Sequence, residues 1–471
     1  MCSLAILNTP CQSFSPVTAF QWRKNKLPSK PLFSASVAVA ADTPVSSSWE
    51  DLETDLSTFH SLHNLPKGEP PVLTFYRDTN GWCPFCERVW LCLHAKGLPY
   101  RERLISLSDK PEWYKELVPT TQVPAVLIHG STEEEEAKTV TERRLVWDSL
   151  DVMKALDEAF PDTKPMILDT PEYELASNLV DDVTRAGVGF VYAGRNATLT
   201  PEDMQERRAN FETALNELEA LLLQNGGPFL LGSELSGVDA KIVPTLERWR
   251  YQLPITKEFS IMESRPALTA WFDAMDAFAP YSERVRGDEY SWVVTAAMFV
   301  RYFGGGDDDE SQAQIARSET KGKELTVAFD EIDVKDCLSR FVHEAAAKLI
   351  SNRDAIVNDC TNKEPKSQSD IVRSSSLDVA ENMLQFTTHI LLPTQEDSSR
   401  EEENVVDVLK RARTITLPSS LLELDYEQKL DAALAAKTVA SRLCVPRDMS
   451  APAAKILRAV LSIISQRLEK E

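Results

Sequence analysis

The feature that most constrains this chain is a pair of cysteines, Cys83 and Cys86, separated by a proline and a phenylalanine. A β-prone apolar segment (71–77) precedes the pair, and a helix-periodic segment (84–97) follows it. A cysteine at such a strand–turn–helix junction lies at a helix start, where unpaired backbone N–H groups favour thiolate over thiol. The pattern therefore predicts a β–α unit whose turn carries a reactive thiol.

Zinc binding and a structural disulfide are the alternatives for this cysteine pair. A structural zinc site takes four ligands, usually from two pairs, and the chain has no second C-x-x-C. A permanent disulfide across one helical turn closes almost no loop and stabilises little. We therefore expect no metal. Cys83 is the expected nucleophile, and Cys86, one turn deeper, is placed to resolve a mixed disulfide.

Composition limits the size class and the partners of the chain. A chain of 471 residues is too long for one ordinary core, so two or three domains are expected. The net charge of −22 argues against nucleic acid as a partner, because an acidic surface repels phosphate. No apolar run approaches the roughly 18 residues of a transmembrane segment. Eight scattered cysteines argue against a disulfide framework.

Residues 1–41 have the composition of a transit peptide. They contain basic residues and serines but neither Asp nor Glu, and they end on a run of small residues. We expect cleavage near Ala41 and residence in the chloroplast stroma, with the mitochondrion as runner-up. A disordered tail without any targeting role is the remaining alternative.

Residues 66–165 have the periodicity of a small α/β domain. The order of the expected elements is β-α-β-α-β-β-α, which is the order of a thioredoxin-like fold. The expected strands are 71–77, 99–106, 123–130 and 143–147, and the expected helices are 84–97, 110–117 and 148–160.

The rest of the chain is helix-periodic. Residues 171–303 predict an all-α domain, in which Ser236 and Asp239 have the spacing of a helix-start cap. The acidic, glycine-containing stretch 304–326 predicts a flexible linker. Residues 327–471 predict a further helical extension. It shows no catalytic constellation, so we expect a separate module that is not needed for chemistry at Cys83.

Four separated motifs give the chain a family resemblance. In this order they resemble the cysteine-type glutathione S-transferases of the omega and lambda-like group, over about residues 71–280. The motifs are 83–100, 110–127, 145–161 and 236–249. The resemblance implies a thioredoxin-like N-terminal domain followed by an all-α transferase domain. The segments 286–305 and 442–454 resemble the iota class of photosynthetic organisms, which carries a long C-terminal extension.

The resemblance also implies a glutathione site with Cys83 as its catalytic cysteine. Each expected contact is assigned to one part of the tripeptide or to the thiols. The assignments are Phe85 beside the thiols, Lys110 at the glycyl end, Val123 with a cis Pro124 at the cysteinyl unit, and Asp148 with Ser149 at the γ-glutamyl end. The family more often has Glu before this Ser, and Asp148 is one methylene shorter.

The implied function is that of a glutathione-dependent thiol transferase and deglutathionylating reductase, with dehydroascorbate reduction also open. A catalytic cysteine forms a mixed disulfide with glutathione, and the substrate is a small hydrophobic or glutathionylated molecule. A monothiol route through Cys83 and a dithiol route that includes Cys86 both stay open. One alternative is a non-enzymatic ligand-binding or assembly protein of the plastid, whose extension binds a protein partner. An iron–sulfur cluster held by Cys83 and glutathione is a third hypothesis.

Overall fold

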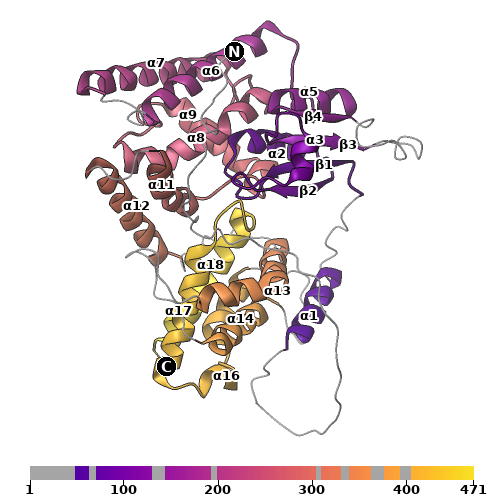
Figure 1. Cartoon of the computed structure of the whole chain (residues 1–471), viewed down its shortest axis with the longest axis vertical. Coiled ribbons are helices and arrows are strands. Elements are labelled where there is room, and N and C mark those ends of the chain that lie inside the picture. The colour runs from indigo at the N-terminus through magenta and orange to yellow at the C-terminus, as the bar shows by residue number, and fades with distance from the viewer. Residues whose placement is uncertain are drawn as a thin grey trace.

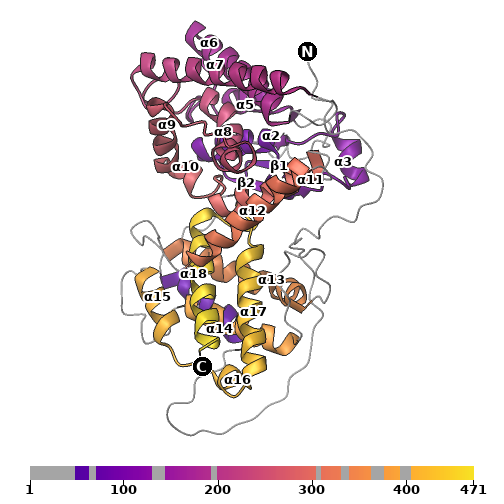
Figure 2. The same cartoon turned by 90° about the vertical axis from the view of Figure 1, so that its left-hand side faces the viewer.

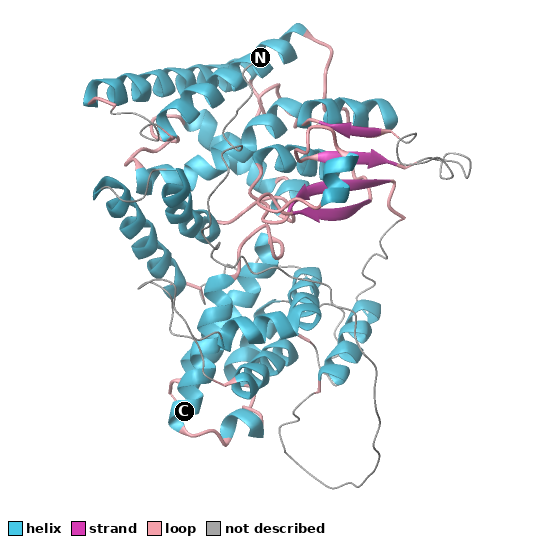
Figure 3. Ribbon diagram, viewed as in Figure 1, coloured by secondary structure: helices cyan, strands magenta, loops and turns pink. Residues whose placement is uncertain are grey.

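The computed structural model describes eight segments of the chain, which form two bodies that meet end to end (Figure 1). The described residues are 48–62, 70–129, 144–192, 199–303, 309–329, 339–361, 376–392 and 405–470. The expected transit peptide and residues 304–308 of the expected linker lie outside them. All four described strands lie in one body, and the other contains described helices and loops alone (Figure 3).

A mixed four-stranded sheet in the order β2-β1-β3-β4 forms the centre of the N-terminal domain. β1 is parallel to β2 and antiparallel to β3, which is antiparallel to β4. The strands are β1 Leu73–Asp78, β2 Tyr100–Ile105, β3 Ala125–Ile128 and β4 Leu145–Trp147, and the helices are α2 Pro84–Ala95, α3 Glu112–Leu117 and α5 Ser149–Ala159. The predicted β-α-β-α-β-β-α order is therefore confirmed.

The local sequence explains why the first β–α unit forms where it does. All six residues of β1 are buried, as expected of a central strand with both faces covered. Pro84 occupies the start of α2, where its missing N–H removes no helical hydrogen bond. Val89, Cys92 and Leu93 recur at helical spacing on the buried face of α2.

A second, all-helical domain packs against α2 and continues the same apolar core. Its helices are α6 Pro171–Val191, α7 Pro201–Asn225, α8 Gly237–Thr256, α9 Pro266–Ala277 and α10 Ala279–Ser282. The predicted cap is present at the start of α8, where the Ser236 backbone N–H donates to Asp239 at 2.9 Å. One buried cluster runs from Leu73 to Val285, so both domains share a core.

Two further helices lie beside α8, and the second corrects the expected linker. They are α11 Glu289–Phe303 and α12 Asp309–Val327. The prediction of a flexible linker is wrong over residues 309–326. Acidic residues at the start of α12 suit a helix N-terminus, and the buried Ser318 lets α12 approach α11 closely, with its hydroxyl donating to Val293 O at 2.5 Å. Arg317 also donates to Ile255 O of α8 at 2.9 Å.

The C-terminal module, which comprises the described residues 339–361, 376–392 and 405–470, is a helical body with an apolar core of its own. Its helices are α13 Ser339–Thr361, α14 Leu377–Leu391, α15 Val405–Thr414, α16 Ser419–Leu422, α17 Tyr426–Arg442 and α18 Ala451–Leu468. α17 and α18 run side by side (Figure 2). The prediction of a helical extension is confirmed.

An N-terminal helix, α1 (Trp49–Leu62), completes the core of this C-terminal module. The Trp49 indole donates to Glu381 Oε1 of α14 at 2.9 Å, and Leu52 is fully buried. Arg353 of α13 pairs with Glu53 at 2.7 Å. The chain therefore begins its described course in the C-terminal module and crosses from there to the sheet. Among the described helices, none combines the length and hydropathy needed to cross a bilayer.

Candidate active site

Cys83 occupies the position that the sequence predicts for a reactive thiol. It caps the start of α2 with an extended backbone (φ −72°, ψ 113°), and its thiol is free and half-buried. Its Sγ lies 3.9 Å from the carbonyl O of Val123. The peptide bond between Val123 and Pro124 is cis, as the resemblance implies. The turn after β1 and the segment before β3 therefore meet at the Cys83 sulfur.

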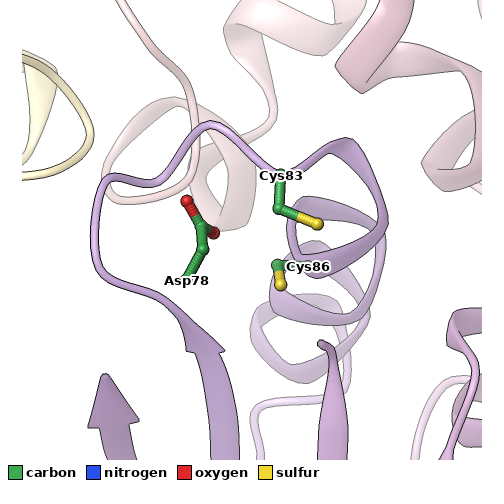
Figure 4. Close-up of side chains that lie close together, drawn as sticks. All are labelled: Asp78, Cys83 and Cys86. Carbon is green, nitrogen blue, oxygen red and sulfur yellow. The ribbon is translucent and has the colours of Figure 1, made fainter. Parts of the chain in front are cut away.

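Cys86 lies one turn deeper in α2 and is fully enclosed (Figure 4). Burial raises the pKa of the Cys86 thiol well above its usual value, and the adjacent Cys83 and the charge of Asp78 raise it further. The two thiols therefore differ in exposure, since Cys83 is half-buried and Cys86 is fully buried. Cys86 is held protonated near neutral pH.

Asp78 is a site residue that the sequence analysis missed. It ends β1, is fully buried, and accepts the backbone N–H of Trp82 at 2.7 Å through Oδ2. Its Oδ1 has no hydrogen-bond partner among the described residues. One ligand atom each of Asp78, Cys83 and Cys86 lie within 4.8 Å of one another (Figure 4). Three such atoms are one fewer than the four of a structural zinc site.

Lys110 is half-buried just before α3, and its environment places it near the active thiol. Burial lowers the pKa of the Lys110 ammonium, and the charge of Cys83 opposes that shift. Lys110 is therefore a cation that lies within electrostatic reach of the Cys83 sulfur.

Asp148 and Ser149 form the start of α5. Asp148 is exposed, has a positive φ of 73°, and accepts the Leu150 backbone N–H at 3.0 Å. Ser149 is buried, and its hydroxyl lies 3.5 Å from a guanidinium nitrogen of Arg88. The expected pair is thus in place at a helix start, although Asp148 uses one of its oxygens as a cap.

Arg88, on α2, is a second residue that the sequence analysis missed. Its guanidinium lies 4.9 Å above the half-buried ring of Phe85 and donates to Lys241 O of α8 at 2.9 Å. Burial lowers the pKa of Arg88, and the charges of Cys83 and Asp148 are among those that oppose this shift. Arg88 therefore brings a buried positive charge between the thiol and the start of α5.

A buried charge cluster between α2 and α8 contacts the Cys83 turn. Arg248 of α8 pairs with Glu87 of α2 at 2.8 Å and donates to the Trp82 carbonyl O at 3.1 Å. Glu247 accepts the Gly287 backbone N–H at 2.8 Å. Burial and the nearby Glu87 raise the pKa of Glu247 to about 8. Through Arg248 the cluster holds the Trp82 carbonyl group, which lies directly before Cys83. The sequence gives no signal for this cluster, because Glu87 and Arg248 lie on separate helices.

Two family models match the chain. The glutathione S-transferase N-terminal domain matches residues 82–159, and the glutathione S-transferase C-terminal domain matches residues 201–274. Among curated relatives, glutathione S-transferase DHAR2 of Arabidopsis thaliana is 30% identical over 202 residues, which cover 42% of this chain and 81% of the relative. Glutathione S-transferase L3 of the same plant is 30% identical over 222 residues, which cover 46% and 85%.

Solved structures that match the chain include glutathione transferase Omega 3C from Trametes versicolor, at 22% identity and a TM-score of 0.37, covering 51% of this chain and 95% of that one. Dehydroascorbate reductase from Chlamydomonas reinhardtii has 23% identity and a TM-score of 0.36, covering 45% and 90%.

The fold is that of a thioredoxin-like domain joined to an all-α domain, with a cysteine at the start of the first helix. The chain belongs to the glutathione S-transferase family. Glutathione is the co-substrate of this family. Both matched models end before the C-terminal module, so the iota class stays a prediction.

Proposed function

We propose that this chain is a glutathione-dependent thiol transferase that reduces glutathionylated substrates through Cys83. The single observation that carries the proposal is the free, half-buried Cys83 thiol at the start of α2, beside the cis Val123–Pro124 segment. The helix start presents its backbone N–H groups near this sulfur, and the Lys110 ammonium lies within electrostatic reach of it. A cysteine there forms a mixed disulfide with glutathione, whereas a hydroxyl group only stabilises the bound glutathione thiolate.

The proposed reaction consists of two thiol–disulfide exchanges. The Cys83 thiolate attacks the glutathione sulfur of a substrate disulfide, the S–S bond breaks, and the substrate leaves as a thiolate that takes up a proton. A second glutathione, as its thiolate, attacks the glutathione sulfur of the Cys83 mixed disulfide. Oxidised glutathione leaves and the Cys83 thiolate is restored. The net reaction converts one mixed disulfide and one glutathione into a free substrate thiol and oxidised glutathione.

Residues near Cys83 and at the start of α5 are proposed to hold the tripeptide. Lys110 binds the glycyl carboxylate, and the backbone of Val123 pairs with the cysteinyl unit. The exposed carboxylate of Asp148 binds the γ-glutamyl ammonium, while Ser149 and the first N–H groups of α5 take the neighbouring carboxylate. Phe85 packs beside the thiols and carries the Arg88 guanidinium on its ring.

The proposed route is monothiol. Cys86 is buried, and its raised pKa leaves little thiolate to resolve a mixed disulfide. Dehydroascorbate is a second candidate substrate, supported by the relative named DHAR2 at 30% identity.

Activity on a glutathionylated peptide, measured with purified full-length protein and its cysteine variants, tests this proposal. Cys83→Ser is expected to abolish reduction, and Cys86→Ser to retain most of it. The reverse result would assign the nucleophile to Cys86. A wild-type protein that binds glutathione but reduces neither the peptide nor dehydroascorbate would favour the non-enzymatic scaffold instead.

We propose the chloroplast stroma as the location. Two relatives carry the word chloroplastic in their names, glutathione S-transferase DHAR3 and glutathione S-transferase L2 of Arabidopsis thaliana. The basic, acid-free residues 1–41 support the same address. Import of a fluorescent protein that carries residues 1–47 into isolated chloroplasts is expected, and import into mitochondria alone would contradict it.

A further inference from the structure

The turn that carries Cys83 is packed against a loop of the C-terminal module. Gly81 is buried, and a Cβ atom added to it would lie 3.4 Å from Cγ of Pro446 and 3.5 Å from the backbone N of Arg447. The Trp82 indole lies against the thiol of Cys444. The end of the module that holds this loop faces the sheet domain (Figure 1). Two of the residues directly before Cys83 are therefore in contact with a segment more than 350 positions away.

The loop that contacts the turn, residues 443–450, is itself tightly held. Asp448 is buried and accepts the Cys444 backbone N–H at 2.8 Å, while Cys444 O accepts the Asp448 backbone N–H at 2.9 Å. The Arg447 guanidinium forms two bonds to the Asp448 carboxylate, at 2.7 and 2.8 Å. Ser450 is bound by Glu344 of α13 at 2.6 Å through its hydroxyl. Because these polar groups are hydrogen-bonded to one another or to α13, the loop 443–450 is rigid.

Three residues connect the loop 443–450 to the sheet-containing body. The Val445 backbone N–H donates to Ser291 Oγ of α11 at 2.9 Å. Arg458 of α18 is almost fully buried, donates to Leu443 O at 2.7 Å, and forms an ion pair with Asp288. The third residue, Arg284, also contacts a residue of the sheet.

Arg284 connects the loop 443–450 to β2 and to α2, the helix that follows the Cys83 turn. It donates to Pro446 O at 3.0 Å, and its guanidinium lies 4.3 Å above the Trp90 ring of α2. It also lies 3.9 Å from Glu102 of β2, whose carboxylate binds Arg77 of β1 at 3.1 Å. The residue that follows Arg77 is Asp78, so the same network reaches both ends of the turn.

We propose that the loop 443–450 is a positioning element of the active site, which holds the Asp78–Cys83 turn in place so that the C-terminal module sets the position of the Cys83 thiol. The proposal deepens the thiol transferase function above and rests on it for its catalytic consequence. Under this proposal the C-terminal module contributes to the chemistry at Cys83, whereas the sequence analysis expects a module that is not needed for it.

Two substitutions in the full-length chain separate this contact from general stability. Arg284→Ala removes the bond to Pro446 O from the body side, and Pro446→Ala removes the ring that packs on Gly81 from the loop side. The control for Arg284→Ala is Arg250→Ala, and the control for the loss of a buried proline from the same module is Pro418→Ala. Arg250 has the same exposed fraction as Arg284 (23%), also stacks on an aromatic ring and pairs with a carboxylate, while Pro418 is a buried proline at the start of α16.

Hydrogen exchange at residues 79–83 and the alkylation rate of Cys83, mapped by peptide mass spectrometry, test the proposal without any glutathione. Arg284→Ala is expected to speed exchange at the turn about tenfold, the size of one lost hydrogen bond to a charged group, and Pro446→Ala is expected to speed it as well. Both are expected to change the alkylation rate of Cys83. The controls are expected to stay within about twofold of wild type. In turnover, kcat is expected to fall with little change in KM for glutathione.

Turn exchange and Cys83 alkylation equal to those of the controls would overturn the proposal. An increase in the exchange rate that is equal over β3, α7 and the turn would overturn the proposal as well. It would show that the substitutions lower the stability of the whole body and do not act on the turn in particular. Absent glutathione activity in the wild type would refute the proposed function and leave both of these readouts intact.

Discussion

The guanidinium of Arg284 donates a 3.0 Å hydrogen bond to the carbonyl O of Pro446, and this bond joins the sheet-containing body to the C-terminal module beside the Cys83 turn. The two residues lie 162 positions apart. A chain that ends near residue 305 would lose this bond, the packing on Gly81 and the cover over Trp82. Contrary to the expectation from sequence, we predict that such a chain has lower kcat than full-length protein. Equal kcat in a folded truncated chain would contradict this.

The helix α1 should contribute to the stability of the C-terminal module. Leu52 is fully buried in the core of that module, and removing a leucine side chain from such a position costs about 2–5 kcal/mol. Leu52→Ala should therefore lower the denaturation midpoint of the module. Leu377→Ala, at a position that is 52% exposed in the same module, is the control. Equal midpoints for the two variants would show that α1 does not support the core.

The charged ends of glutathione should depend on Lys110 and Asp148. Loss of a charge-assisted hydrogen bond reduces affinity by roughly 10- to 100-fold. Lys110→Gln and Asp148→Asn should each raise the glutathione dissociation constant by this amount, measured by calorimetry. Asn keeps an oxygen to cap α5, so the charge alone is tested. The exposed neighbours Lys115→Gln and Asp151→Asn are the controls and should bind glutathione as tightly as wild type does. If Lys110→Gln and Asp148→Asn bind glutathione as tightly as these controls, Lys110 and Asp148 do not belong to the site.

Asp78→Asn should lower the pKa of Cys86. The negative charge of Asp78 disfavours a second negative charge on the enclosed thiol, so its removal lets the thiolate form at lower pH. The amide oxygen can still accept the Trp82 N–H. Thiolate absorbance titrated against pH in a Cys83→Ser background measures the shift. Exposed Asp109→Asn is the control, and an unchanged or raised Cys86 pKa in Asp78→Asn would contradict the prediction.

Glu247 should make the folded state less stable as the pH rises. Its pKa is raised from 4.5 to about 8 in the folded chain, so the folded state holds a proton that the unfolded state has released over this interval. Its contribution to stability is present below about pH 4.5 and is lost as the pH rises through about 8, at no more than about 1.4 kcal/mol per pH unit.

Glu247→Gln keeps an acceptor for the Gly287 N–H but has no proton to lose. Thermal midpoints at about pH 6 and about pH 8.5 should therefore differ less in Glu247→Gln than in wild type. A variant with the same pH dependence as wild type would show that another group titrates in this interval.

Features set by neighbouring residues could be predicted from the sequence. Cys83 at a helix start, the proline at position 84 and the cap of Ser236 and Asp239 all depend on signals within one continuous stretch of sequence, and the structure has each of them. The cis bond before Pro124 followed from the family resemblance.

Features set by distant contacts could not be predicted in this way. Arg88 and Lys241 are 153 positions apart, and Trp49 and Glu381 are 332 apart, so neither pair leaves a local pattern. Asp78 lies between the expected strand 71–77 and the expected helix 84–97, and its buried oxygen is evident only beside the folded thiols. The acidic start of α12 resembles a linker until α8 and α11 provide a surface for its small residues.

The most direct test of the account is to locate the mixed disulfide. Full-length Cys86→Ser protein is mixed with a glutathionylated peptide in the absence of free glutathione, quenched with acid, and digested for mass spectrometry. The account predicts that the peptide is released as a free thiol and that one glutathione is found on Cys83, in equal amounts. Release of the peptide thiol with glutathione on another cysteine, or no release although Cys83 remains a free thiol, would contradict it.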